Sequence, residues 1–323
     1  MVARAVKNAL LLVASAIVAL AAAEVFSRAW FPPLADEAWD RAEVSEVGSS
    51  QIAGQTVEGL SNSLGLRGPE VPLASDRYRI LALGDSFTYG FKLSNASSWP
   101  KLLEGILHDA GRPEIEVLNG GRPGTDTQWQ LDYFRNLASR YRPDMVVIGF
   151  VINDCTELCS NCGVVKIKER LDAARRKREG RFSSRFLRRL EVALLERRLS
   201  TKTVERFRRA YTDESPGLAH CQAAFREIRA LSEASRFALL VFIYPMLYKL
   251  ESPYPFIGIH DQMLAFWQSL GIRAYDLTPA FYGRRDTDLW VQNDDSHPTR
   301  EANLIAARAI ADVITSLETG DGP

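Results

Sequence analysis

The sequence has no net charge, no internal repeat, and only four cysteines and four histidines. Its 40 lysines and arginines balance 40 acidic residues, so the chain as a whole has no electrostatic field that attracts nucleic acid, and we expect no nucleic-acid partner. No low-complexity tract dominates the composition, which excludes a chain that is disordered throughout. Hydrophobic residues make up 46% of the 323 positions, enough for one large domain with a full core.

The N-terminal segment, residues 1–30, contains a long apolar run. Arg4 and Lys7 precede a run from Ala9 to Ala23 that has no charged residue and is apolar except for Ser15. Basic residues followed by such a run predict a secretory signal peptide or an N-terminal membrane anchor, and a buried core helix is the alternative. The small side chains of Ala21 and Ala23 suit cleavage after Ala23.

A signal peptide and a membrane anchor would both place the rest of the chain across a membrane. An anchor would contact the bilayer through residues 9–26 and hold the protein on the inner membrane facing the periplasm, whereas cleavage would leave a secreted or periplasmic protein. Residues 31–76 contain Pro, Gly, Ser and acidic residues with little periodicity, which predicts a linker or surface wrap. We expect the main domain over 77–318 and a short tail over 319–323.

Short apolar strands alternate with amphipathic helices through the main domain. We predict strands near residues 80–83, 114–119, 144–152, 237–244 and 272–277, and helices near 98–110, 126–140, 218–235, 259–270 and 300–317. This alternation predicts an α/β fold with a doubly wound parallel sheet flanked by helices. In such folds the ligand site lies beyond the carboxyl ends of the strands.

A basic stretch interrupts this alternation at about residues 163–215. Residues 163–214 contain 17 lysines and arginines against 8 acidic residues. The stretch is helix-prone, and we read it as a solvated helical insertion in the main domain. The alternative is a surface that contacts anionic lipid head groups or an acidic polysaccharide, because basic amphipathic helices bind such surfaces.

Ser86 occupies a position that suits a nucleophile. The uncharged run Ile80–Leu83 predicts a strand buried on both faces, and Gly84 and Asp85 end it. Ser86 follows where the strand passes into a turn, and the next residues can open a helix whose free N–H groups point back at the serine. Alternatively, Asp85 and Ser86 merely cap an ordinary strand end.

A serine that cleaves esters needs a histidine base and a carboxylate that orients it. Only His297 has a carboxylate three residues before it, Asp294, in a segment (NDDSHP) expected to form a loop before the last helix. We therefore predict His297 as the base and Asp294, rather than Asp295, as its partner. The other histidines are expected to be structural or surface residues: His108, His220 and His260.

Donors for an oxyanion also follow the predicted strands. The backbone N–H groups of Ser86 and Gly124 and the side-chain amide of Asn153 would converge if the three strands are neighbours. Glycine at position 124 allows the backbone to approach a substrate closely, and the Asn153 amide can donate, whereas the neighbouring Asp154 cannot when ionised. The alternative is that Gly124 and Asn153 only form turns.

These blocks together resemble the SGNH (GDSL) hydrolases over roughly residues 60–317. They are Gly84-Asp85-Ser86-Phe87, the glycine loop ending at Gly124, Asn153-Asp154, and Asp294-x-x-His297. The resemblance implies a flavodoxin-like three-layer sandwich and no metal or cofactor. It also implies Ser86 as nucleophile and first oxyanion donor, Gly124 and Asn153 as further donors, and Asp294 and His297 as the acid–base pair. In one departure, Val151 occupies the position of the usual glycine two residues before the asparagine.

The family includes enzymes that cleave carboxylic esters, deacetylate sugars or transfer acyl groups. We therefore expect a serine esterase that acts on an acylated glycan or lipid, with O-acetyl or short acyl esters favoured. An O-acyltransferase for an extracellular polysaccharide and a non-catalytic carbohydrate-binding module are the alternatives. The segment 62–68 and the N-terminal apolar run also resemble membrane-tethered bacterial members, which favours the anchor.

Three of the four cysteines are closely spaced. Cys155, Cys159 and Cys162 have the spacing that some radical enzymes use for an iron–sulfur cluster. In an exported chain, oxidised cysteines are the better interpretation. With Cys221, three disulfide pairings can be drawn, and the sequence does not choose among them.

Overall fold

The computed structural model describes residues 2–30, 61–136, 138–156, 185–292 and 295–319, together with 170 and 173. The chain divides into two compact units. The first contains Met1–Val44 and Lys166–Lys202, and the second contains Ser45–Val165 and Thr203–Pro323. Each unit is described separately.

The first unit contains the N-terminal helix and the start of a basic helix. Helix α1 spans Val2–Trp30, and helix α7 spans Arg185–Ala210 and continues into the second unit. Within α1, Lys7–Trp30 is a 24-residue segment long and apolar enough to cross a membrane, and its apolar side chains are exposed. At about 1.5 Å per residue, it reaches beyond the roughly 30 Å of a bilayer's hydrocarbon core. Glu24 in α1 accepts a hydrogen bond from the backbone N–H of Phe186 at 3.0 Å.

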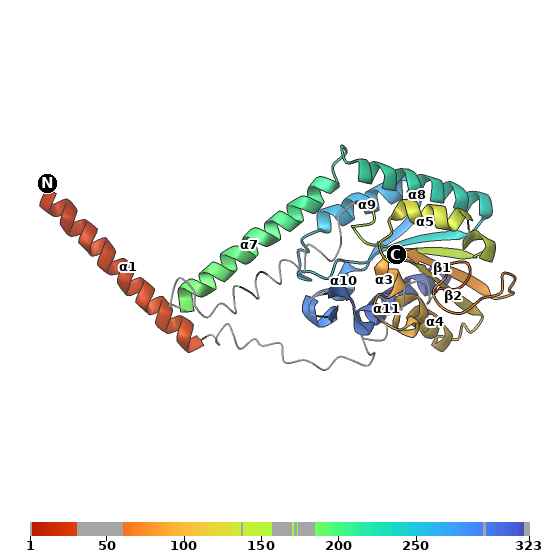
Figure 1. Cartoon of the computed structure of the whole chain (residues 1–323), viewed down its shortest axis with the longest axis horizontal. Coiled ribbons are helices and arrows are strands. Elements are labelled where there is room, and N and C mark those ends of the chain that lie inside the picture. Colours follow the sequence, from red (N-terminus) through yellow and green to blue (C-terminus); the bar gives the residue numbers. More distant parts are fainter. Residues whose placement is uncertain are drawn as a thin grey trace. The chain divides into compact units, whose positions relative to one another are not determined.

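The second unit is built on a five-stranded sheet in the order β2-β1-β3-β4-β5, with all neighbouring strands parallel (Figure 1). The strands are β1 (Tyr78–Gly84), β2 (Ile115–Gly121), β3 (Met145–Phe150), β4 (Ala238–Ile243) and β5 (Arg273–Asp276). This order is that of flavodoxin-like folds, and it confirms the predicted α/β class and parallel sheet.

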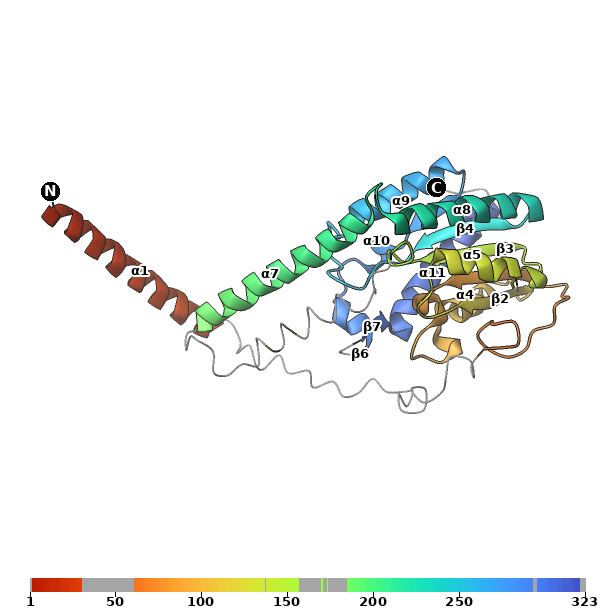
Figure 2. The same cartoon turned by 45° about the horizontal axis from the view of Figure 1, so that its top comes forward.

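Helices cover both faces of the sheet, as a parallel sheet requires. They are α4 (Trp99–Asp109), α5 (Thr127–Asn136), α8 (Pro216–Ser235), α9 (Ile257–Ser269) and α11 (Arg300–Thr319), with the short helices α3 (Ser86–Tyr89) and α10 (Thr278–Phe281). Helices α4 and α11 pack together on one face, and α5 packs beside α8 on the other (Figure 2). The predicted helix over 126–140 is shorter in the structure, because a 3-10 turn over Ala138–Tyr141 follows it.

The central strands are buried because the core lies on both of their faces. Every residue of β3 is buried, as are all residues of β1 after Tyr78. On the α8 side, Phe150 packs edge-on against Phe225 of α8 and Trp267 of α9, with ring centroids 6.1 and 5.0 Å apart. The apolar runs that predicted these strands are therefore the centre of the core.

The segment before the last helix is a hairpin and not the loop that the sequence predicted. Strands β6 (Trp290–Gln292) and β7 (Asp295–Pro298) pair antiparallel, with Gln292 opposite Asp295. All four residues of β7 are buried, which is unusual for a polar DSHP sequence. The polar burial points to a role other than core packing.

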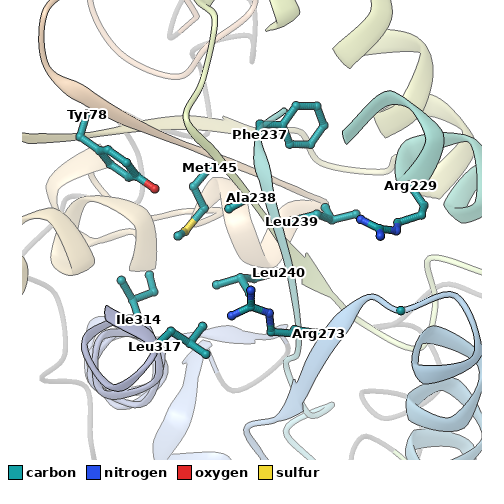
Figure 3. Close-up of a pocket in the computed structure, with 11 residues that line it drawn as sticks. Tyr78, Met145, Arg229, Phe237, Ala238, Leu239, Leu240, Arg273, Ile314 and Leu317 are labelled. Atoms are coloured by element: carbon teal, nitrogen blue, oxygen red, sulfur yellow. The ribbon is translucent and has the colours of Figure 1, made fainter. Parts of the chain in front are cut away.

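A cavity of about 420 Å³ lies at the amino ends of the strands (Figure 3). Tyr78, Met145 and Ala238, the first residues of β1, β3 and β4, contribute to its wall. Ser86 and His297 do not line it, because Ser86 follows the opposite, carboxyl end of β1. This cavity is therefore not the site described below.

Candidate active site

Ser86 is the first residue of helix α3, directly after β1. Asp85 caps the helix, and its carboxylate accepts a hydrogen bond from the backbone N–H of Phe87 at 2.8 Å. Gly84 permits this sharp turn, because a Cβ there would lie 2.1 Å from the Thr88 hydroxyl oxygen and 2.7 Å from the Gly149 carbonyl oxygen. The turn holds the Ser86 hydroxyl at the carboxyl end of the sheet, as the sequence predicted for a nucleophile.

The Ser86 side chain contacts His297 directly. Its Oγ lies 2.8 Å from Nε2 of His297, within hydrogen-bond distance for proton transfer. His297 is part of β7, so the hairpin carries the imidazole to the serine. Only 6% of Ser86 and 8% of His297 is exposed, which shields the contact from bulk water.

The carboxylate that orients His297 belongs to Asp295. Its Oδ1 is hydrogen-bonded to Nδ1 of His297 and also accepts from the His297 backbone N–H at 3.1 Å. The sequence-based choice of Asp294 differs from this finding, and Asp294 itself lies outside the described residues. The physical reason is the strand: Asp295 and His297 are two positions apart in β7, and in a strand residues two apart share a face. The choice of Asp294 had assumed a turn.

Asp295 remains ionised beside the imidazole. Burial raises the pKa of this carboxyl, but hydrogen bonds and charge attraction from His297, together with the ammonium of Lys92, more than offset the burial and hold it well below its usual range. The Lys92 Nζ lies 2.9 Å from Asp295 Oδ2. A fixed negative charge at Nδ1 favours the tautomer in which Nε2 is free to accept a proton.

Two phenylalanines enclose the imidazole. The ring centroid of Phe91 lies 4.7 Å from that of His297, and the centroid of Phe87 lies 5.8 Å away. Phe87 packs edge-on against Tyr244 at the end of β4. The aromatic contacts restrict rotation of the ring and keep its Nε2 directed at Ser86.

Asn153 follows β3, beside the turn that carries Ser86. Its side-chain amide donates to Asp85 Oδ2 at 3.1 Å, and the Ser86 hydroxyl lies 3.4 Å from the same oxygen. The predicted neighbourhood of Ser86 and Asn153 is thus present, with the carboxylate of Asp85 between them. Burial raises the pKa of Asp85, although the bonds from Asn153 and Phe87 oppose that rise.

Gly124 lies in the loop after β2, the neighbour of β1 in the sheet. Its φ of +74° is in the left-handed region that favours glycine, and no heavy atom lies within 4 Å of the position that a Cβ would occupy. The residue is exposed. The oxyanion role predicted for Gly124 therefore stays a prediction.

Val151 forms the turn before Asn153 without a glycine. Its carbonyl accepts from the Asp154 backbone N–H at 2.8 Å, and its own N–H donates to the Asp154 carboxylate at 3.2 Å. Its φ is not positive, so the turn does not require the freedom of glycine. The valine that departs from the family pattern is fully buried.

One disulfide lies within the described residues. Cys155 forms a disulfide with Cys221 of α8, and both residues are buried. The bond ties the segment after Asn153 to a helix of the core. Cys159 and Cys162 lie outside the described residues.

Comparison with known proteins identifies the family. The model of the GDSL-like Lipase/Acylhydrolase family matches residues 82–304, which span the serine turn and the histidine hairpin. The chain belongs to the GDSL-like lipase/acylhydrolase family. Membership places it among the esterases and acylhydrolases, as the resemblance had implied.

Individual relatives of this GDSL-family chain are distant. It is 34% identical over 76 residues to a protein named Arylesterase from Vibrio mimicus, and the match covers 24% of this chain and 38% of that protein. Among solved structures, it is similar to the psychrotrophic esterase EstA from Pseudoalteromonas sp. at 19% identity, covering 75% of this chain and 99% of that one with a TM-score of 0.43. It is also similar to Axe2, an acetylxylan esterase from Geobacillus stearothermophilus, at 15% identity, with 75% and 95% covered and a TM-score of 0.45.

Sequence reasoning missed two residues of the site. Asp295 could have been found from strand periodicity, because Asp295 and His297 are two positions apart and β7 is a strand. Lys92 carries no local signal, since its partners Gln292 and Asp295 are about 200 positions away. Only the fold brings that ammonium to the site.

Proposed function

We propose that this protein is a serine esterase that cleaves carboxylic esters of short acyl groups, with O-acetyl esters favoured, through an acyl-serine intermediate. The observation that carries the proposal is the hydrogen-bonded chain Ser86 Oγ, His297 Nε2, His297 Nδ1, Asp295 Oδ1. In that order, a hydroxyl, a base and a buried carboxylate make the arrangement that activates a serine in otherwise unrelated folds. The family match supports the reaction class.

In the first half-reaction, Ser86 Oγ attacks the carbonyl carbon of the ester while its proton passes to His297 Nε2. The ionised Asp295 stabilises the imidazolium that forms. When the tetrahedral intermediate collapses, the carbon–oxygen bond to the alcohol breaks, and His297 gives its proton to the leaving alkoxide. The acyl group then remains on Ser86 as an ester.

In the second half-reaction, a water molecule gives a proton to His297 and attacks the acyl carbon. The bond to Ser86 Oγ breaks, Oγ recovers the proton, and the free acid leaves. We assign stabilisation of the oxyanion in both halves to the backbone N–H groups of Ser86 and Gly124 and to the side-chain amide of Asn153. Ser86 is the first residue of α3, so its N–H has no partner within the helix.

We further propose that α1 anchors the enzyme in a membrane and that the hydrolase unit is exported. The exposed apolar segment Lys7–Trp30 and the buried disulfide Cys155–Cys221 support this. Disulfides persist in oxidising compartments and are rare in the cytosol. Esters on an extracellular glycan or on lipid are then the substrates within reach. The predicted anionic contact of residues 163–214 stays a prediction, because much of that stretch lies outside the described residues.

An ester panel tests the proposal. The full chain in detergent micelles, with Ser86→Ala as the blank, is given p-nitrophenyl acetate, butyrate and octanoate, and free acid is measured beside the coloured alcohol. We expect acid and alcohol in equal amounts in water alone, fastest with acetate. If added glycan diverts the acyl group from water to sugar, the enzyme is an O-acyltransferase. No turnover of any ester, with or without glycan, would support the carbohydrate-binding alternative.

A further inference from the structure

Lys92 connects the two parts of the chain that meet at the site. Its Nζ lies 2.9 Å from Asp295 Oδ2 and 2.5 Å from the side-chain oxygen of Gln292. Gln292 and Asp295 face each other across the β6–β7 hairpin. One ammonium therefore binds both strands of the hairpin that carries His297, and it holds the carboxylate oxygen that His297 does not use.

The segment that carries Lys92 begins at Ser86. The backbone N–H groups of Gly90 and Phe91 both donate to the Ser86 carbonyl, each at 3.1 Å. Gly90 ends α3 in the left-handed conformation, and Lys92 itself has a φ of +63°, a value that few residues with side chains adopt. The route from the nucleophile to the ammonium is thus a tight turn of fixed geometry.

A buried arginine holds the turn between Ser86 and Lys92 in place. The guanidinium of Arg67 donates to the carbonyl of Gly90 at 2.9 Å and also to the carbonyls of Tyr89 and Leu93. It stacks on the Tyr89 ring, with Cζ 4.1 Å from the ring centroid, and only 6% of the residue is exposed. Because three carbonyls bind one rigid planar cation, Lys92 is presented to the hairpin in one position.

The charges around His297 are few in the described part of the chain. Asp295 and Lys92 lie on the Nδ1 side, and Asp85 lies on the serine side, where its charge would attract an imidazolium. Burial raises the pKa of both Asp85 and Asp154, and the negative charge of Asp85 raises that of Asp154 further. Asp295 and Lys92 are therefore the ion pair at Nδ1 of the imidazole.

We propose that Lys92 is a positioning residue for the reaction: it holds Asp295 in place relative to Ser86 and places a positive charge at the carboxylate oxygen that His297 does not use. This inference rests on the proposed function, since it assigns a role within the same site. Without Lys92, Asp295 would bind a proton on His297 more strongly, and the free base would form only at higher pH. The ammonium acts through Asp295 and does not touch the reacting atoms.

The test compares three variants of the full chain in detergent micelles. Lys92→Met removes the charge but keeps the side-chain length, and like lysine it has a Cβ at the positive φ of position 92. Lys92→Arg keeps the charge. Lys101→Met is the matched control, because Lys101 pairs with Glu104 at 2.6 Å and its side chain is 29% exposed, against 32% for Lys92. Each variant is assayed for kcat/KM against pH, and its melting temperature is recorded.

We expect Lys92→Met to move the midpoint of the acid limb up by roughly one pH unit, as loss of a neighbouring unit charge does, and to lower kcat/KM on the plateau by roughly tenfold. Lys92→Arg and Lys101→Met should keep the wild-type midpoint. A rate loss with an unmoved midpoint would overturn the proposal. NMR titration of 13C-labelled His297 compares the same variants without any substrate. The role of Lys92 can therefore be tested even if the protein hydrolyses no ester, a result that would contradict the proposed function.

Discussion

The hydroxyl oxygen of Ser86 and Nε2 of His297 lie 2.8 Å apart, although 211 positions separate the two residues in the sequence. The first follows the interior strand β1, and the second belongs to the hairpin before α11. A parallel sheet brings these segments together because its ligand side is the carboxyl end of the strands. The contact is the basis of the predictions that follow.

Replacing Asp295 should damage catalysis far more than replacing Asp294. Asp295→Asn removes the charge that orients and stabilises the imidazolium, and we expect kcat to fall by roughly 10³- to 10⁴-fold, as loss of the triad carboxylate does elsewhere. Asp294→Asn should stay within a few-fold of wild type. Steady-state kinetics of the two variants at one pH decide the matter, and a loss confined to Asp294→Asn would restore the sequence-based assignment.

The sequence was sufficient to predict the parallel sheet but not the β6–β7 hairpin. Uncharged runs such as Ile80–Leu83, closed by Gly84 and Asp85, predict buried strands because a strand covered on both faces removes successive apolar residues from water. The DSHP segment has no such signal, since its residues are polar and turn-forming by propensity. Its strand conformation comes from pairing with β6, which is a tertiary effect. The choice of Asp294 rested on the loop conformation expected for this segment, whereas in the strand Asp295 bonds to His297.

Polar contacts between residues far apart in the sequence also could not be predicted. Lys92 and Arg67 look like ordinary surface cations, and their partners are known only once the chain has folded. The pairing of Cys155 with Cys221 has the same origin, because residue spacing does not say which helix lies over which loop. What residue type and local order could predict was that Ser86, His297 and Asn153 lie near one another.

Asn153→Ala should lower the rate without unfolding the protein. Loss of one oxyanion donor costs roughly 10²- to 10³-fold in kcat, whereas KM for a small ester should change little. Asn153 is half-buried, and its one described side-chain bond is to Asp85, so we expect a melting temperature within a few degrees of wild type. Equal activity of wild type and Asn153→Ala would remove this residue from the oxyanion site.

Because of Asp154, the free energy of unfolding should fall as pH rises. Burial raises the pKa of Asp154 well above its usual value, and the charge of Asp85 raises it further. In the unfolded chain the carboxyl ionises near pH 4, but in the folded chain it stays protonated until higher pH, so each pH unit above about 4 costs the folded state up to about 1.4 kcal/mol. The stability of Asp154→Asn relative to wild type should therefore increase from pH 4 to pH 7. Urea denaturation at both pH values measures this, and a constant difference would contradict it.

The disulfide should be found by peptide mapping without reductant. We expect the linked pair to be Cys155 and Cys221, and the double variant Cys155→Ser/Cys221→Ser to lose roughly 2–4 kcal/mol of unfolding free energy. Because Cys155 follows Asn153 by two positions, kcat should fall along with stability. A map that links Cys155 to Cys159 or Cys162 would contradict the structure.

The central claim is that His297 activates Ser86 as the nucleophile. The most direct measurement is intact-mass analysis of the full chain after treatment with a serine-directed fluorophosphonate, followed by peptide mapping. We predict a single adduct on Ser86 in the wild type, none in Ser86→Ala, and labelling slowed by several orders of magnitude in His297→Ala. An unlabelled wild type, or an adduct of equal yield in Ser86→Ala, would contradict the claim.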